Sequence, residues 1–254
     1  MAYQRVHILE HKQVADGIFS MTVPADEPAK AGQFYMLRRT DSQVLLPRAI
    51  SVCDRSPGRL RFLYQVVGSG TEGFSRLRQG DEICITGPLG NGFPLDELER
   101  QAPAAPCRIA LVGGGIGVAP LLYTARVLKE KGIPADCLAG FRDEPFLLDE
   151  LGQVCGSVAV STESGRTGHK GYVTALLEPA AYDVVLVCGP EPMMKAAVAL
   201  CKNAGTPVYV SLENKMACGL GACLVCTCTD KQGKNRRTCK EGPVFRGEEI
   251  DFDA

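Results

Sequence analysis

The sequence predicts a β plus α/β protein in three successive parts: an antiparallel six-stranded β-barrel over residues 1–100, a parallel α/β domain over residues 101–212, and a small cysteine-rich segment over residues 213–254. Three features of the chain support this prediction. Short runs of alternating apolar and polar residues, separated by Gly, Pro and Asp, fill the first part. Strand-like and helix-like runs alternate in the second part. Five cysteines fall between positions 218 and 239 in the third part.

The first part contains six short stretches that read as strands, several with the two-residue period of a half-buried strand. They cover residues 5–9, 18–23, 33–37, 48–53, 60–67 and 82–86. A short helix is expected over residues 72–77. Turn residues between the stretches favour a barrel or a sandwich. Residues 101–106, Gln-Ala-Pro-Ala-Ala-Pro, have the composition of a linker.

From residue 107 the period changes, and short apolar strands alternate with helices. Strands are expected over residues 108–112, 135–140, 156–160, 183–188 and 207–212. One helix is expected after the glycine-rich turn, ending near residue 131. Three more are expected over residues 145–151, 172–177 and 191–203. This alternation predicts βαβ units and a parallel sheet with both faces covered by helices.

The composition is that of an ordinary globular protein, with 45% apolar and 22% charged residues among 254. The formal net charge of −1 gives no electrostatic reason to bind nucleic acid or a membrane surface. No apolar run reaches the roughly 18 residues that a membrane-spanning helix needs. Residues 1–10 lack the basic and apolar regions of a signal peptide, so a cytoplasmic protein is expected.

Four cysteines near the C-terminal end have the spacing C-x4-C-x2-C-x12-C. They are Cys218, Cys223, Cys226 and Cys239. Thiolates are soft ligands that select iron–sulfur, zinc or copper centres, and this spacing is typical of a plant-type [2Fe–2S] cluster. A structural zinc is the alternative, but zinc sites generally pair two short C-x2-C units and only one is present. A visible spectrum separates the coloured cluster from colourless zinc.

A glycine-rich turn, Gly113-Gly-Gly-Ile-Gly117, joins the first α/β strand to its helix. Such a turn presents backbone N–H groups and the positive helix end to a phosphate. The pattern is G-x-G-x-x-P, through Gly115, Gly117 and Pro120, in place of the usual G-x-G-x-x-G of dinucleotide sites. Tight strand–helix packing is an equally good explanation of these glycines.

Cys188-Gly189-Pro190 follows the fourth α/β strand. In open α/β sheets ligands bind beyond the carboxyl ends of the strands, which places this turn beside the glycine-rich turn. The alternative is a buried structural cysteine followed by a plain turn.

The first part carries two further candidates for phosphate contact. Arg48 and Ser51 lie on an otherwise apolar strand, and arginine pairs bidentately with phosphate. Gly70 and Thr71 belong to a small Gly-Ser-Gly-Thr loop that leads into the expected short helix. Taken singly, an arginine on a barrel rim and an ordinary hairpin turn explain them as well.

The order of these motifs, R-x-x-S, G-x-G-T, G-G-G-x-G-x-x-P and C-G-P, resembles the ferredoxin–NADP reductase superfamily over about residues 1–212. Within it, the stretch from Glu213 to Cys228 is similar to the electron-transfer subunits of NAD-dependent dihydroorotate dehydrogenases. The resemblance implies FAD, a [2Fe–2S] cluster and NAD as cofactors.

The resemblance also assigns residues to each cofactor. It implies FAD contacts at Arg48, Ala49, Ile50, Ser51, Leu63, Tyr64, Gln65, Gly70 and Thr71. It implies contacts to the nicotinamide dinucleotide at Gly115, Gly117, Cys188, Gly189 and Pro190, with Thr162 and Glu163 in a loop that touches it. It implies cluster ligation by Cys218, Cys223, Cys226 and Cys239, with Cys228 as a bystander. Ala49 stands where the family usually has proline.

The three cofactors together indicate conversion between the two electrons of a hydride and the single electrons of a cluster. No catalytic side chain is needed for this. The resemblance implies that the partner is an FMN-containing catalytic subunit that oxidises dihydroorotate to orotate in pyrimidine (UMP) biosynthesis, in a heterotetramer with two copies of each subunit. The alternative is a subunit of a related ferredoxin:NAD(P) or sulfide-linked oxidoreductase. Some of those relatives replace a cluster cysteine by aspartate, whereas all four positions are cysteine in this chain.

Overall fold

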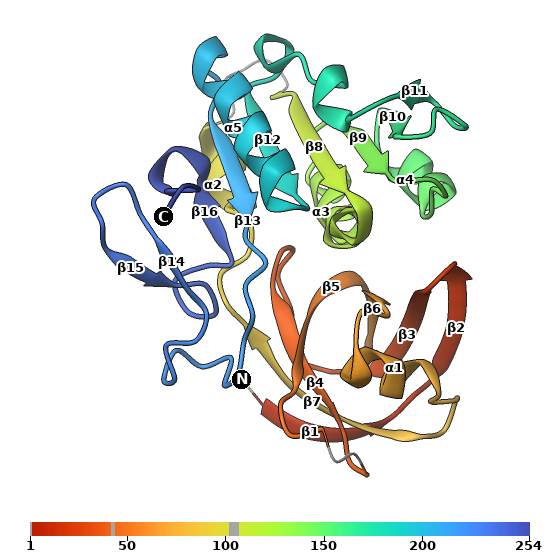
Figure 1. Cartoon of the computed structure of the whole chain (residues 1–254). Helices are drawn as coiled ribbons and strands as arrows, with labels where there is room; N and C mark the ends of the chain where they lie inside the picture. Colours follow the sequence, from red (N-terminus) through yellow and green to blue (C-terminus); the bar gives the residue numbers. More distant parts are fainter. Residues whose placement is uncertain (1, 42–43, 102–106) are drawn as a thin grey trace.

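The N-terminal sheet has seven antiparallel strands in the order β1-β7-β4-β5-β6-β3-β2. The structure is a computed structural model that describes residues 2–41, 44–101 and 107–254. The strands are β1 (Ala2–His7), β2 (Glu10–Ala15), β3 (Ile18–Pro24), β4 (Phe34–Arg39), β5 (Arg48–Ser56), β6 (Arg59–Gln65) and β7 (Glu82–Leu89). The sheet curls into a half-barrel, in red to yellow in Figure 1, and α1 (Ser69–Ser75) lies beside β4.

The prediction of a six-stranded barrel is therefore wrong in its strand number. The additional strand is β2, whose sequence Glu-His-Lys-Gln-Val-Ala is mostly polar. It lies at the edge of the sheet beside β3, and its mostly polar sequence shows no apolar alternation. The strand order begins with β1 and ends with β2.

The second sheet has the order β11-β10-β9-β8-β12-β13-β16. The five predicted strands are all present and parallel to one another: β8 (Ile109–Gly114), β9 (Ala135–Phe141), β10 (Ser157–Thr162), β12 (Val184–Cys188) and β13 (Val208–Ser211). The short β11 (His169–Lys170) extends one edge.

Helices cover both faces of this sheet, as predicted. Successive residues of β8 point to opposite faces, so Leu111 packs in the same core as α3 (Ala119–Glu130) while Val112 packs in that of α5 (Glu191–Ala204). The helix expected over 145–151 is shifted to α4 (Leu148–Val154).

Two stretches between the main elements differ from expectation. The helix expected over residues 172–177 is only the 3-10 turn η2 (Val173–Leu176). A second 3-10 turn, η3, begins at Pro179 and ends at Ala181, and this proline follows too soon for an α-helix to form. An unexpected helix, α2 (Leu95–Gln101), precedes the second sheet. It takes in the first residue of the predicted linker, and the rest, residues 102–106, lies outside the described residues.

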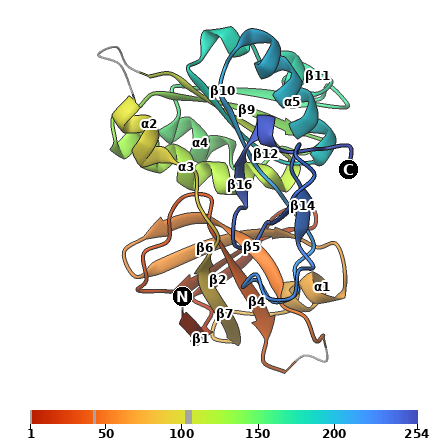
Figure 2. The same ribbon diagram turned by 90° about the vertical axis from the view of Figure 1, so that its left-hand side faces the viewer.

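The cysteine-rich segment is not a separate appendage after the last α/β strand, because part of it joins the second sheet. Its strand β16 (Val244–Arg246) pairs antiparallel with β13, with Phe245 opposite Val210, and so extends the second sheet. A hairpin of β14 (Thr227–Thr229) and β15 (Asn235–Arg237) precedes it. Figure 2 shows the segment, in blue, running from the edge of the α/β sheet toward the first sheet.

Candidate cofactor sites and cysteine centre

Arg48 and residues 68–71, called the Gly70 loop here, come together in the structure. This loop forms the N-terminal turn of α1. A Cβ atom added at Gly70 would lie 2.3 Å from Nε of Arg48, so the guanidinium lies directly over the loop backbone. Both residues line one hollow with Phe74. Thr71 shapes this loop, because its hydroxyl accepts the backbone N–H of Val67 at 3.0 Å and donates to the Gly68 carbonyl at 3.1 Å. A cation and a glycine-lined backbone therefore converge at one end of β5.

The residues that follow on β5 and β6 face different neighbours. Ala49 packs beside the cysteine segment, and Leu63 packs against the beginning of α3. Gln65 is exposed.

The Tyr64 side chain packs in the core of the first sheet. It is 1% exposed, its hydroxyl bonds Nε2 of His11 at 2.9 Å, and its ring stacks with Phe19. Burial raises the pKa of Tyr64 and lowers that of His11. The Tyr64 ring therefore lies within this core.

The glycine-rich turn and the Cys188 turn touch through their backbones. A Cβ at Gly117 would lie 2.4 Å from the carbonyl oxygen of Cys188, and one at Gly189 would lie 2.9 Å from the amide nitrogen of Gly114. Gly115 has φ of +55°, which favours glycine. The turn forms the 3-10 helix η1 (Gly115–Val118), which also contacts β6. The structure thus brings the two predicted dinucleotide turns together and places the glycine-rich turn against β6, the strand expected to flank the flavin.

Cys188 is held as a neutral thiol at the carboxyl end of β12. Burial raises its pKa to about 12, and the nearby Glu213 carboxylate acts in the same direction. Thr162 and Glu163 lie at the end of β10, two strands away from β8 in the sheet order. The Thr162 hydroxyl donates to the carbonyl of Thr167 and so closes its own loop.

The four spaced cysteines lie in two pairs. The thiol of Cys218 lies beside that of Cys223. Burial acts to raise the pKa of Cys218, but backbone N–H groups, including that of Leu220 at 3.3 Å, and the Cys223 thiol lower it to about 6. Cys226 and Cys239 form the second pair, in which burial and the neighbouring thiol raise the pKa of Cys239 to about 12. The backbone N–H of Cys239 donates to Sγ of Cys226 at 3.4 Å.

The arrangement of the thiols suits the metal centre that the spacing predicts. Each iron of a [2Fe–2S] cluster takes two thiolates. Backbone N–H groups are directed at the sulfur atoms of Cys218 and Cys226. Two adjoining thiol pairs of this kind fit the two-iron cluster.

The cysteine pairs rest on the first sheet next to the β5 strand. Cys226 and Cys239 are each 2% exposed and pack with Met36 and Leu89, with Ala49 at the side of the same cluster. Gly219 approaches this surface closely, since a Cβ there would lie 2.7 Å from Cγ of Met36. Sequence reasoning missed Met36 and Leu89, because their alternation on β4 and β7 predicts only a buried face.

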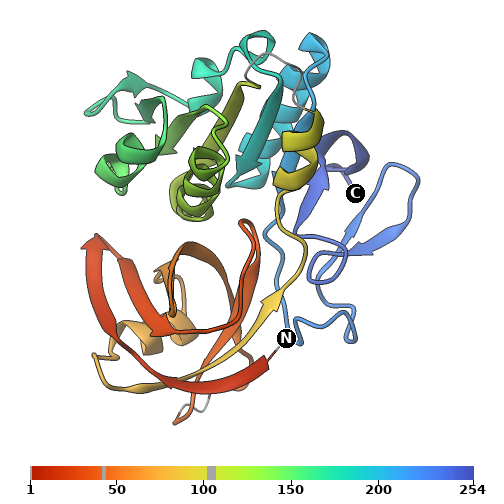
Figure 3. The ribbon, with the colours of Figure 1, turned by 180° about the vertical axis from the view of Figure 1, so that it is seen from behind.

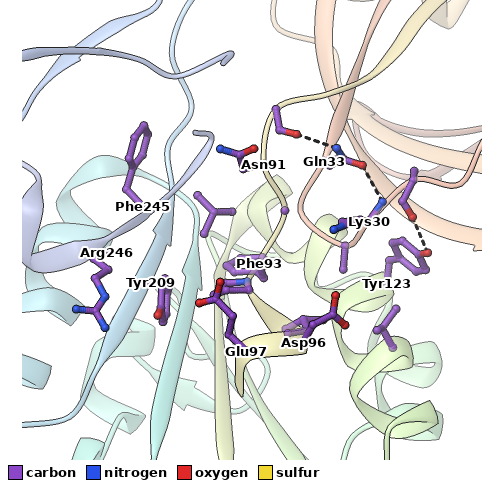
Figure 4. Close-up of a pocket in the computed structure, with 18 of the residues that line it drawn as sticks. Lys30, Gln33, Asn91, Phe93, Asp96, Glu97, Tyr123, Tyr209, Phe245 and Arg246 are labelled. Carbon is purple, nitrogen blue, oxygen red and sulfur yellow. Dashed lines mark hydrogen bonds between the residues drawn. The ribbon is translucent and has the colours of Figure 1, made fainter. Parts of the chain in front are cut away.

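A cavity of about 730 Å³ lies elsewhere, between the barrel loop at residues 29–33, α2 and the β13–β16 edge. Figure 4 shows Lys30, Asp96, Glu97 and Arg246 around it. None of the predicted site residues lines this cavity. The sites above are built instead where strands β5, β6, β8 and β12 and the cysteine segment meet.

The half-barrel with its arginine and glycine loop, the parallel sheet with its glycine turn, and the paired cysteines define an iron–sulfur flavoprotein reductase. A model of the iron–sulfur cluster binding domain of dihydroorotate dehydrogenase B matches residues 213–251. The electron transfer subunit of dihydroorotate dehydrogenase B (NAD+) from Clostridium perfringens is 46% identical over 99% of both chains. That from Clostridium acetobutylicum is 47% identical over 96% of this chain and 95% of its own. The chain belongs to this family of electron transfer subunits.

Solved structures agree with this assignment. An NADH-dependent reduced ferredoxin–NADP oxidoreductase superposes with a TM-score of 0.84 at 30% identity, over 98% of this chain and 90% of that one. A ferredoxin–NADP+ reductase from Neisseria gonorrhoeae, solved with FAD and NADP, has a TM-score of 0.68 at 19% identity, over 85% and 95%. The second likeness shows the shared fold. No helix among the described residues is long and apolar enough to cross a membrane.

Proposed function

We propose that this chain carries electrons between NAD and the dihydroorotate-oxidising subunit of a dihydroorotate dehydrogenase, in pyrimidine biosynthesis. One observation supports this most directly: the paired cysteines pack beside Ala49 of β5, while the glycine turn contacts β6. Of the two neighbouring strands that bear the proposed flavin contacts, β6 therefore contacts the nucleotide turn and β5 contacts the cysteine segment. We infer from these contacts that electrons pass between the three sites in this order.

FAD, a [2Fe–2S] cluster and NAD are the cofactors of this route. When bound, FAD exchanges a hydride with the nicotinamide and single electrons with the cluster, which connects two-electron to one-electron chemistry. The chain itself positions the cofactors. Arg48 and the Gly70 loop hold the flavin phosphates, residues Ala49–Ser51 and Leu63–Gln65 border the flavin, and Gly115, Gly117 and Cys188–Pro190 border the dinucleotide. Cys218, Cys223, Cys226 and Cys239 are the cluster ligands, and Cys228 is not.

The functional division follows the predicted boundaries, with FAD bound by residues 1–100, NAD by 101–212 and the cluster by 213–254. The partner is a catalytic subunit that carries FMN, and the complex is a heterotetramer with two copies of each subunit. We place it in the cytoplasm, where a reducing environment keeps cysteine thiols available as cluster ligands.

Replacing Arg48 by Gln is expected to release FAD from the chain. The guanidinium over the Gly70 loop provides the charge that pairs with a phosphate, and a charge-assisted bond contributes about 1.5–3 kcal/mol, or roughly ten- to a hundredfold in affinity. The FAD retained on gel filtration and its dissociation constant measure the effect. Arg5→Gln is the matched control, because Arg5 pairs with Glu82 and does not line the hollow that Arg48 and Gly70 share. Equal FAD retention in both variants would remove Arg48 from the site.

Purification with a co-expressed catalytic subunit tests the function as a whole. The complex is expected to couple NADH oxidation to orotate reduction, and the isolated chain is expected to reduce its own flavin with NADH but not orotate. If the complex forms and NADH reduces its flavin while orotate is untouched, the acceptor is a different molecule and the proposed function is wrong.

A further inference from the structure

One ion pair joins the strand that borders the flavin to the helix that begins at the glycine turn. Asp54 lies on β5 and Arg126 on α3. Nε of Arg126 donates to Oδ1 of Asp54 at 2.8 Å, and its Nη2 donates to Oδ2 at 2.9 Å. Two parallel bonds fix the relative rotation of the two groups as well as their distance.

The pair lies at a similar distance along each element from the proposed cofactor contacts. Asp54 follows Ser51 by three residues, which is about 10 Å along a strand. Arg126 follows the start of α3 at Ala119 by seven residues, which is about 10 Å along a helix. β5 and α3 are in direct contact along this length. In Figure 3 α3 lies between its own sheet and the curled sheet.

The surroundings of the pair keep it rigid. The Asp54 side chain is 17% exposed and that of Arg126 is 36% exposed, so water screens the pair only in part. Oδ1 of Asp54 also accepts the backbone N–H of Arg55 at 2.9 Å. One turn before Arg126, the buried Tyr123 hydroxyl donates to the carbonyl of Ala29 at 2.9 Å, a second tie between α3 and the first sheet.

We propose that Asp54 and Arg126 are positioning residues that set the nicotinamide at its reacting distance from the flavin. This rests on the proposed function, because it deepens the role of the same two cofactor sites. Neither Asp54 nor Arg126 is among the residues proposed to contact FAD or the dinucleotide. The pair acts by fixing the position of β5 relative to the glycine turn. Hydride transfer is steep in distance, and a misplacement of about 1 Å costs about a hundredfold in rate.

The full complex with its partner subunit is used for the test, and FAD reduction by NADH is followed by stopped-flow absorbance. Asp54→Asn is isosteric and removes the charge. Its limiting reduction rate is expected to fall at least tenfold, with the KM for NADH within twofold of wild type. The isotope effect with NADH deuterated at C4 is expected to rise, because hydride transfer becomes slower relative to binding. The exchange of charges, Asp54→Arg with Arg126→Asp, is expected to restore the rate at least threefold over either single change.

Glu150→Gln is the matched control. Glu150 on α4 pairs with Arg61 on β6 at 2.5 Å. The substitution therefore removes another ion pair between a helix of the α/β domain and the first sheet, but α4 does not begin at the glycine turn. Its rate is expected to stay within twofold of wild type. An unchanged rate in Asp54→Asn, or an equal loss in Glu150→Gln, overturns the positioning role. Absence of FAD reduction by NADH in the wild-type complex would instead count against the proposed function.

Discussion

Cys223→Ser is expected to abolish electron delivery to the partner while NADH still reduces FAD. Cys223 is paired with Cys218 and is the exposed thiol of the four, so its loss leaves one half of the paired centre with a single sulfur ligand. Serine is a harder and far less acidic ligand than a thiolate. Since loss of a residue that merely supports a ligand costs about 10–100-fold, loss of a ligand is expected to exceed a hundredfold.

Two measurements on the same complex separate the halves of the route. Stopped-flow reduction of FAD by NADH is expected to stay within twofold of wild type, and steady-state orotate reduction is expected to vanish. Cys228→Ser is the control, because Cys228 is half-buried in the β14–β15 hairpin and its thiol donates to the Arg236 carbonyl at 3.6 Å. Orotate reduction retained by Cys223→Ser, or lost equally in Cys228→Ser, contradicts the ligand assignment.

Gly117→Ala is expected to slow NADH-driven reduction of FAD by about a hundredfold. The new methyl group would meet the Cys188 carbonyl oxygen at 2.4 Å and Cα of Gly189 at 2.6 Å, so two rigid backbones must separate. Both belong to turns proposed to border the dinucleotide, and a shift of about 1 Å there costs about a hundredfold in rate. Reduction by dithionite, which needs no nucleotide site, is expected to be unchanged.

Gly132→Ala controls for the introduction of a methyl group into a turn. Gly132 has φ of +71° after α3, and a Cβ there meets no atom within 4 Å. The change is expected to lower stability by about 1 kcal/mol, through the strained left-handed backbone alone, and to leave NADH-driven reduction unchanged. A normal rate in Gly117→Ala, with the fold confirmed by circular dichroism, would show that the close contact serves strand packing only.

Much of the fold follows from local pattern. The five predicted strands of the second sheet are mostly apolar and alternate with helical segments along the chain, so they were predictable within a few residues. The edge strand β2 was not, because its mostly polar sequence, Glu-His-Lys-Gln-Val-Ala, has no apolar period. The short strand β16 was missed for a different reason: it is stabilised by pairing with β13, some thirty residues earlier in the chain.

The sequence alone determined the chemistry available to this protein. The spacing of four thiols, the glycines of the nucleotide turn and the arginine of β5 are properties of short stretches, because each reflects the local geometry that a metal centre or a phosphate requires. The tertiary structure decided how these stretches are combined. Cys226 and Cys239 pack on Met36 and Leu89, the glycine turn contacts β6, and Asp54 pairs with Arg126. These contacts join residues distant in the chain, and no periodicity records which distant surfaces will meet.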